Sequence, residues 1–183
     1  CHMRTKRGEL RFAKMQCAGT DYIVIDNRDG RISCAESLCV TLCDRHFGVG
    51  GDGIALIEQS DVADAKMRMF NRDGSPGGMA GSCLMLVGKY LHDRGIAPGG
   101  EVSIEAGGGV KRVKLLLTDG LATSARVDMG EMCFAAAKVP VNLPGEEVVN
   151  RLAEFGGRDS RRTCLSMGNP HCVTFVERVD ALD

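Results

Sequence analysis

One junction in the sequence combines a glycine-rich turn with the start of an apolar helix. It reads GSPGGMAGSCLMLVGKYL over residues 74–91, with Ala80, Gly81 and Ser82 at the boundary. Backbone N–H groups at a helix N-terminus have no partner within the helix, so a carboxylate would bind there readily. Cys83 falls in the first turn, where an exposed thiol would be acidified, although packing in a core is the commoner role of such a cysteine. The junction therefore predicts an anion site, with or without a reactive thiol.

Two further stretches place polar side chains at turns. MGNPHC, residues 167–172, holds Asn169, whose amide donates and accepts hydrogen bonds, and His171, which can act as an acid or a base near neutral pH. FNRDGS, residues 70–75, places Asn71 at the end of a predicted strand. An asparagine in such a place can bind a ligand or simply stabilise a turn, and the turn is the commoner role for Asn169. Both alternatives stay open from the residues alone.

The stretch FGVGGDG, residues 47–53, formally matches the dinucleotide fingerprint G-x-G-x-x-G. That fingerprint requires a strand before the glycines and a helix after them. Here a predicted helix over residues 35–46 precedes the glycines, and a predicted strand over 53–59 follows them. We therefore predict a loop that needs positive φ angles, and not a nucleotide site.

Short strands outnumber helices among the predicted elements. Alternating or β-branched apolar runs predict strands at residues 10–15, 21–26, 53–59, 65–71, 101–106, 111–118 and 121–130. Apolar positions along one face predict a helix over 80–94, which Gly95 would end. The turn NRDG, residues 27–30, contains an Asp-Gly pair that indicates a hairpin. These elements predict an α+β fold, and not a doubly wound sheet.

Composition restricts the classes of function. The 183 residues are 44% hydrophobic and 26% charged, which is enough apolar material for a packed core. A net charge of −1 and an aromatic content of 4% disfavour nucleic acid as a partner, and the apolar stretches are too short to span a membrane. Nine cysteines without a C-x-x-C pair disfavour a zinc ribbon and fit reduced thiols. The expected location is the cytoplasm.

Six stretches together resemble the diaminopimelate epimerase family of pyridoxal-independent amino-acid epimerases and racemases. They are FAKMQCAGTDYIVID, DRHFGVGGDG, MRMFNRDGS, MAGSCL, VDMG and MGNPHCV, in the family's order and over nearly the whole chain. The resemblance implies two pseudo-symmetric lobes, each a curved antiparallel sheet around a central helix. Residues 1–124 would form the complete first lobe, and residues 125–183 would begin the second.

The activity that the resemblance implies is inversion at the α-carbon of LL-diaminopimelate, a step of lysine biosynthesis. Two cysteines, one from each lobe, would flank this carbon, and neither a cofactor nor a metal would take part. The implied partners are the small amino-acid substrate and either a second copy of the chain or a further C-terminal segment that completes the cleft.

The same resemblance assigns the site residues. Ala80 occupies the position of the family's first catalytic cysteine, and His171 matches a histidine near the catalytic centre. The positions that match the family's substrate-binding residues are Thr20, Gly53, Asn71, Gly81, Ser82 and Asn169. Two of them, Thr20 and Ser82, replace asparagines of the family.

Alanine at position 80 leaves three interpretations. A methyl group can neither take nor give a proton, so Ala80 removes one half of a two-cysteine mechanism. The chain is then an epimerase piece whose cysteine was replaced, or a natural relative that binds or racemises another amino acid, or a protein in which Cys83 has taken over the thiol role. The last requires a shift of about 5 Å along the helix, whereas catalytic geometry tolerates about 0.5 Å. The further substitutions at Thr20 and Ser82 favour natural divergence.

Overall fold

The computed structural model describes residues 9–107 and 109–181. The chain divides into two compact units, a first unit that ends at Asp128 and a second unit that begins at Met129. The expected boundary between residues 124 and 125 lies within the last strand of the first unit. The assignment of these units to the two lobes of the family stays a prediction.

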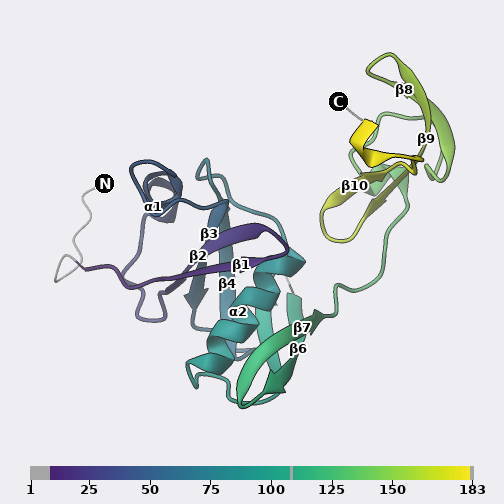
Figure 1. Ribbon diagram of the computed structural model, residues 1–183. Coiled ribbons are helices and arrows are strands. Elements are labelled where there is room, and N and C mark those ends of the chain that lie inside the picture. The colour runs from purple at the N-terminus through teal and green to yellow at the C-terminus, as the bar shows by residue number, and fades with distance from the viewer. Residues whose placement is uncertain (1–8, 108, 182–183) are drawn as a thin grey trace. The chain divides into compact units, whose positions relative to one another are not determined.

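Within the described residues, the first unit is built on a seven-stranded sheet whose spatial order follows the chain (Figure 1). Its strands are β1 (Ala13–Cys17), β2 (Thr20–Asp26), β3 (Gly53–Glu58), β4 (Ala65–Asn71), β5 (Glu101–Ala106), β6 (Gly109–Thr118) and β7 (Leu121–Val127). Neighbouring strands pair antiparallel except for β2 with β3 and β4 with β5, which pair in parallel.

The two parallel pairings depend on the two helices of this unit. Parallel neighbours need a crossover connection, and the helices α1 (Ala35–Cys43) and α2 (Gly81–Asp93) lie in the connections from β2 to β3 and from β4 to β5. The NRDG turn at residues 27–30 therefore leads into α1 and does not close the hairpin that its Asp-Gly pair predicted. That prediction was wrong because the next strand pairs in parallel with β2.

Helix α2 lies inside the curl of the sheet. It contacts each of the strands from β1 to β7 (Figure 1). Its buried residues are Cys83, Leu84, Leu86, Val87, Gly88 and Leu91. A Cβ atom on Gly88 would lie 2.8 Å from Val113 Cγ1, so glycine permits the close approach of α2 to β6. The expected α+β fold, a curved sheet around a central helix, is confirmed.

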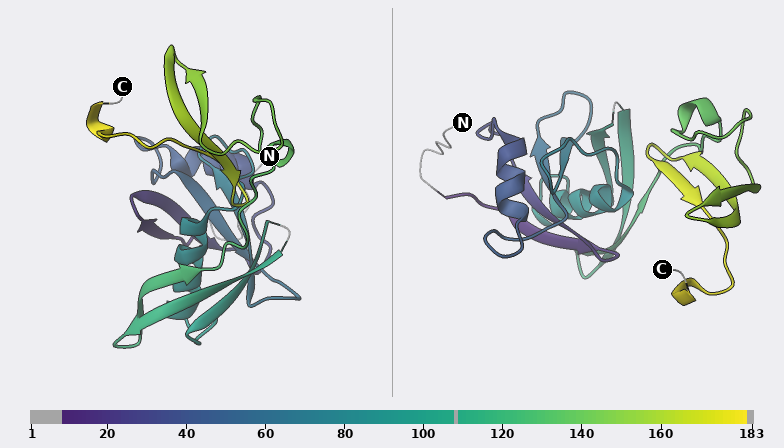
Figure 2. Two further views of the ribbon diagram at one scale, coloured as in Figure 1. Left: turned by 90° about the vertical axis from the view of Figure 1, so that its right-hand side faces the viewer. Right: turned by 90° about the horizontal axis from the view of Figure 1, so that it is seen from above.

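Helix α1 covers the opposite face of the strands β2 to β4 (Figure 2). The cluster of buried residues that it forms with them contains Ile23, Ile25, Leu38, Cys39, Cys43, Ile54, Leu56 and Phe70. Side chains alternate across a strand, so Val24 and Ala55 point to the side of α2, and both are fully buried. Burial on both faces explains why DYIVID and GIALIE are nearly uninterrupted apolar runs.

The second unit is smaller. Its sheet has the order β10–β9–β8, formed by β8 (Arg151–Phe155), β9 (Arg158–Ser166) and β10 (Pro170–Val173). Two single-turn 3-10 helices, η1 (Ala136–Lys138) and η2 (Val179–Ala181), accompany it. Its buried core contains Val139, Val148 and Cys164.

Two further findings bear on the predictions from composition. In the described part of the chain, none of the helices has the length and apolar character of a membrane span. The free thiols among the described residues are Cys17, Cys39, Cys43, Cys83, Cys133, Cys164 and Cys172. Four of these seven, Cys39, Cys43, Cys83 and Cys164, are buried, which agrees with a packing role for these four. Cys34 is disulfide-bonded, so the expectation of reduced thiols was wrong for this residue.

Candidate functional site

Three of the predicted site residues lie at the same end of three neighbouring strands. Gly53, the first residue of β3, pairs with Tyr22 of β2 on one side and with Asn71, the last residue of β4, on the other. Thr20 begins β2 two residues before Tyr22. The register of the sheet therefore brings Thr20, Gly53 and Asn71 to one edge.

The N-terminus of α2 lies near this edge. Burial raises the pKa of Tyr22 to about 12, with further contributions from the nearby Cys83 and Asp52. Cys83 belongs to the first turn of α2, and Asp52 directly precedes Gly53. Pro76 forms a β-bridge with Phe70, and the Gly77 N–H donates to the Met69 carbonyl at 2.8 Å, so the segment that leads into α2 runs beside the end of β4.

The first turn of α2 has no side-chain cap. Ala80 is the N-cap residue, in an extended conformation, and its methyl group offers no acceptor. The first helical hydrogen bond runs from the Leu84 N–H to the Ala80 carbonyl at 3.1 Å. The N–H groups of the preceding residues, Gly81 and Ser82 among them, therefore face out of the helix, and both residues are partly exposed. This arrangement favours an anion, as the sequence predicted.

Asn71 presents its amide at the surface. Its Nδ2 donates to Ser75 Oγ at 3.0 Å, and Ser75 Oγ donates to Asp73 Oδ1 at 2.6 Å. These contacts orient the amide and use a donor, while Asn71 Oδ1 has no partner among the residues that the structure describes. A shallow surface hollow beside it is lined by Asp52, Asn71, Arg72 and Asp73. Positive and negative groups thus surround the asparagine, which suits a zwitterion.

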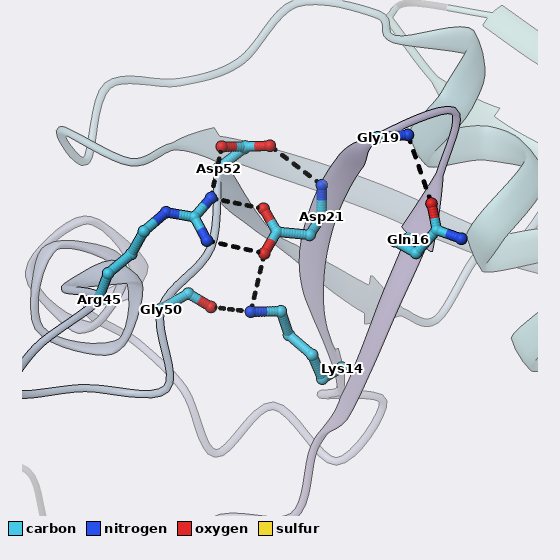
Figure 3. Close-up of polar contacts among 7 residues, drawn as sticks. All are labelled: Lys14, Gln16, Gly19, Asp21, Arg45, Gly50 and Asp52. Carbon is cyan, nitrogen blue, oxygen red and sulfur yellow. Dashed lines mark hydrogen bonds and ion pairs between the residues drawn. The ribbon is translucent and has the colours of Figure 1, made fainter.

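A cluster of charges fixes the ends of these strands (Figure 3). Arg45 donates to both carboxylate oxygens of Asp21, at 2.8 and 3.1 Å, and to Asp52 Oδ1 at 2.9 Å. Lys14 Nζ lies 2.9 Å from Asp21 Oδ2 and also donates to the Gly50 carbonyl. Hydrogen bonds from Arg45, and then from Lys14, hold the pKa of Asp21 well below its usual range.

Backbone hydrogen bonds extend this cluster to β4. The Asp52 N–H donates to the Asp21 carbonyl at 2.8 Å, and the Arg72 N–H donates to the Asp52 carbonyl at 3.0 Å. Each candidate residue at the sheet edge is adjacent in sequence to a residue of this network. Thr20 precedes Asp21, Gly53 follows Asp52, and Asn71 precedes Arg72. This network was not predicted from the sequence, although the charged residues directly beside Thr20 and Gly53 were a usable signal.

The glycine-rich loop before β3 caps α1. The Gly48 N–H donates to the Asp44 carbonyl, those of Val49 and Gly50 donate to the Leu42 carbonyl, and that of Gly51 to the Cys43 carbonyl. These bonds satisfy the carbonyl groups at the helix end. Gly50 has a φ of +78°, as predicted for this loop. The order of helix, glycines and strand is confirmed, and the N–H groups that a nucleotide phosphate would need are already used.

Gly53 has no room for a side chain. A Cβ atom there would lie 2.3 Å from the Phe70 carbonyl oxygen and 3.0 Å from the ring of Tyr22. Any contact of this residue with a ligand must therefore come from its backbone.

Cys83 is a packing residue. Its side chain is fully buried, and burial raises its pKa to about 12. A thiol with this pKa is protonated at neutral pH and cannot act as a base there. The interpretation in which Cys83 replaces the missing thiol is therefore excluded in this structure.

Asn169 is the last residue of the tight turn between β9 and β10 in the second unit, and His171 is the second residue of β10. The turn is closed by the Met167 N–H, which donates to the Asn169 carbonyl at 3.1 Å. The Asn169 side chain instead lies with its Oδ1 3.0 Å from His171 Nε2, and both residues are exposed. The amide thus orients the imidazole and does not cap the turn. That these two residues meet the first-unit site stays a prediction.

Among the described residues, no group of three or more His, Cys, Asp or Glu side chains is arranged to hold a metal ion.

The model of the family described as "Diaminopimelate epimerase" matches residues 12–135. The chain belongs to the diaminopimelate epimerase family. The diaminopimelate epimerase of Acetivibrio thermocellus is 40% identical over 171 residues, which are 93% of this chain and 61% of that protein. That of Desulfovibrio desulfuricans is 42% identical over 180 residues, 95% of this chain and 63% of the relative. The chain thus spans less than two thirds of the length of these relatives.

A solved structure supports the diaminopimelate epimerase-like fold. A probable proline racemase from Agrobacterium radiobacter superimposes with a TM-score of 0.67 over 91% of this chain and 52% of that chain, at 14% identity. At this identity the likeness shows the fold alone. The family expected from the six sequence stretches is confirmed, while the roles of the individual site residues stay predictions.

Proposed function

We propose that this chain forms the substrate-binding part of a diaminopimelate epimerase-like isomerase, which inverts the α-carbon of LL-diaminopimelate without a cofactor. The observation that carries the proposal is the uncapped N-terminus of α2 near the sheet edge that holds Thr20, Gly53 and Asn71. The relatives named above are diaminopimelate epimerases, which supports this substrate.

Recognition of an α-amino acid follows from the charges of the site. The substrate carboxylate would accept hydrogen bonds from the N–H groups of Gly81 and Ser82, where the helix dipole favours negative charge. The free Oδ1 of Asn71 would accept from the ammonium group. The family resemblance assigns Asn169 and His171 of the second unit to the same ligand, and we include them in the proposal on that ground.

Inversion at the α-carbon places two demands on the protein. Negative charge develops on the carboxylate side when the α-proton leaves, and the α2 N-terminus would stabilise that charge. One group must remove the proton while another delivers a proton to the opposite face. Ala80 cannot serve in either role, so we infer that the chain as sequenced binds the amino acid without inverting it.

A second candidate function is a non-catalytic amino-acid-binding protein on the same fold. Ala80 together with the buried Cys83 favours it, because neither residue can transfer a proton at the helix start. Thr20 and Ser82, in place of asparagines, favour a ligand other than diaminopimelate. In either case we propose a cytoplasmic protein with a small-molecule ligand, completed by a second copy or by a further C-terminal segment.

Calorimetry and solvent exchange test both candidates. We expect LL-diaminopimelate to bind the unmodified chain, and proton NMR in D2O to show no loss of the α-proton signal. Tighter binding of another amino acid from a panel of lysine, glutamate and proline would favour the second candidate. Absence of binding to any α-amino acid would contradict the proposed site, and α-proton exchange by the unmodified chain would contradict the role assigned to Ala80.

A further inference from the structure

The turn that follows β4 packs directly on α1. The Asn71 N–H donates to the Ser75 carbonyl at 2.9 Å, and the Gly74 N–H donates to the Asn71 carbonyl at 2.8 Å. Gly74 has a φ of +84°, and a Cβ atom on it would lie 2.8 Å from the Glu36 carbonyl and 3.1 Å from Val40 Cγ2. The turn therefore rests against α1 without a gap.

The same face of α1 makes a polar contact with Asn71. Glu36, Cys39 and Val40 are three and four residues apart, so they share one side of the helix. Cys39 Sγ lies 3.0 Å from the Asn71 carbonyl oxygen and 3.7 Å from that of Phe70. The thiol thus donates to the backbone of the residue that carries the candidate ligand-binding amide.

The thiol is suited to this donor role. Cys39 is fully buried, and burial raises its pKa, so its S–H proton is present throughout the neutral range. The Asn71 carbonyl receives both this S–H and the Gly74 N–H, and these two contacts hold the peptide plane from two directions. The direction of this plane sets where the Asn71 side chain leaves the backbone.

We propose that Cys39 is a positioning residue for Asn71 in the amino-acid site. The inference rests on the proposed function, in which Asn71 contacts the ligand. Binding sites need their groups held to within about 0.5 Å, and Asn71 stands at the end of a strand, where the sheet supports it on one side only. Cys39 supplies support from beneath the turn, although its side chain is remote from the surface.

Three variants and two measurements test the proposal. Cys39→Ala removes the donor, and Cys39→Ser keeps a donor at the same position. Cys43→Ala removes an equally buried thiol of α1, whose Sγ lies 3.7 Å from Cys39 Sγ and makes no contact with Asn71. The dissociation constant of LL-diaminopimelate is measured by calorimetry. Exchange of the Asn71 and Gly74 amide protons is measured by NMR, together with the unfolding midpoint of each variant.

We expect Cys39→Ala to raise the dissociation constant roughly three- to fivefold, the lower part of the range for one lost hydrogen bond because S–H is a weak donor, and to accelerate exchange of both amides by a similar factor. Cys39→Ser and Cys43→Ala should stay within about twofold of the unmodified chain for both quantities. Both alanine variants should lower the unfolding midpoint, because each leaves a small cavity.

The outcomes separate this proposal from the proposed function. Equal effects of Cys39→Ala and Cys43→Ala on affinity and amide exchange would show that core packing alone is responsible, and would overturn the positioning role. If the unmodified chain binds no α-amino acid, the proposed function fails, but the amide exchange rates still decide whether Cys39 fixes the turn. Unchanged exchange in Cys39→Ala would overturn the inference even where binding is intact.

Discussion

Arg45 holds both carboxylate oxygens of Asp21, at 2.8 and 3.1 Å, although the two residues are 24 positions apart in the chain. The same guanidinium reaches Asp52 at 2.9 Å. Asp21 follows Thr20 and Asp52 precedes Gly53, so this contact fixes the starts of β2 and β3 relative to each other. The positions of Thr20 and Gly53 at the sheet edge therefore depend on a charge cluster that itself need not touch the ligand (Figure 3).

Neutralising Asp21 tests the contribution of this cluster to stability. We expect Asp21→Asn to lower the unfolding midpoint at neutral pH by roughly 2–6 °C, since hydrogen bonds to a charged group are lost. Asp29→Asn is the matched control, because Asp29 pairs with Arg31 in a more exposed bridge and should shift the midpoint by no more than about 2 °C. Thermal unfolding followed by circular dichroism measures both.

The contact between Arg45 and Asp21 predicts that the stability of the fold depends on pH. The pKa of Asp21 is lowered in the folded protein from the ordinary value of 3.8, so its stabilisation is complete above that value. It is lost as the pH falls below 3.8 toward the folded-state pKa, where the folded carboxylate finally takes up a proton. The difference in midpoint between the unmodified chain and Asp21→Asn should therefore shrink over this acidic range. A difference that is constant with pH would contradict the role of the charge.

Gly53→Ala tests the close approach of β3 to β4. The new Cβ would lie 2.3 Å from the Phe70 carbonyl oxygen, so the strands must move apart next to Asn71. We expect a loss of about 1–3 kcal/mol in the free energy of unfolding, measured by urea denaturation. Gly100→Ala is the control, since a Cβ there meets no atom within 4 Å, and it should change the free energy by less than about 0.5 kcal/mol. Equal losses in the two variants would refute the steric argument.

Local patterns predicted most of the first unit. The alternating run AKMRMFN predicted a strand over 65–71, which is the observed extent of β4, and the helix predicted over 80–94 is observed as Gly81–Asp93. Helix α1 ends at Cys43 and not at residue 46, because the following loop turns back to cap it. The hairpin predicted from Asp29 and Gly30 was wrong because an Asp-Gly pair indicates a turn but not which strand follows it. The pairing of β2 with β3 is set by the crossover through α1.

In the candidate site, too, the features that depend on local sequence could be predicted, and the contacts between distant segments could not. Asn71 and the start of α2 could be identified because a strand end and a helix start are visible in the sequence. The contacts among Arg45, Asp21 and Asp52 could not, since they join segments up to 31 residues apart and depend on strand register. The contact of Cys39 with Asn71 was invisible for the same reason, because it requires α1 to lie beneath the turn after β4.

A thiol introduced at position 80 should be acidic. In Ala80→Cys the side chain would stand at the N-cap of α2, where the helix dipole lowers a thiol pKa below its ordinary value of about 8.5. Cys83, three residues on, should stay unreactive, since burial raises its pKa to about 12. Alkylation by iodoacetamide over a pH series, resolved by peptide mass spectrometry, compares the two sites. If alkylation of the new thiol has a higher pH midpoint than alkylation of a free cysteine, the helix start does not stabilise negative charge.

A side-chain cap on α2 should raise the stability of the fold and weaken binding of the ligand. In Ala80→Asp the new carboxylate would accept hydrogen bonds from the N–H groups of the first turn, and we expect the unfolding free energy to rise by about 0.5–1 kcal/mol. The same carboxylate would occupy the place proposed for the ligand's carboxylate and repel it, so the dissociation constant for LL-diaminopimelate should rise at least roughly tenfold. Ala80→Asn forms a similar cap without the charge, so it should stabilise the fold with a smaller loss of affinity. If Ala80→Asp stabilises the protein and still binds LL-diaminopimelate as the unmodified chain does, the ligand's carboxylate does not bind at the start of α2.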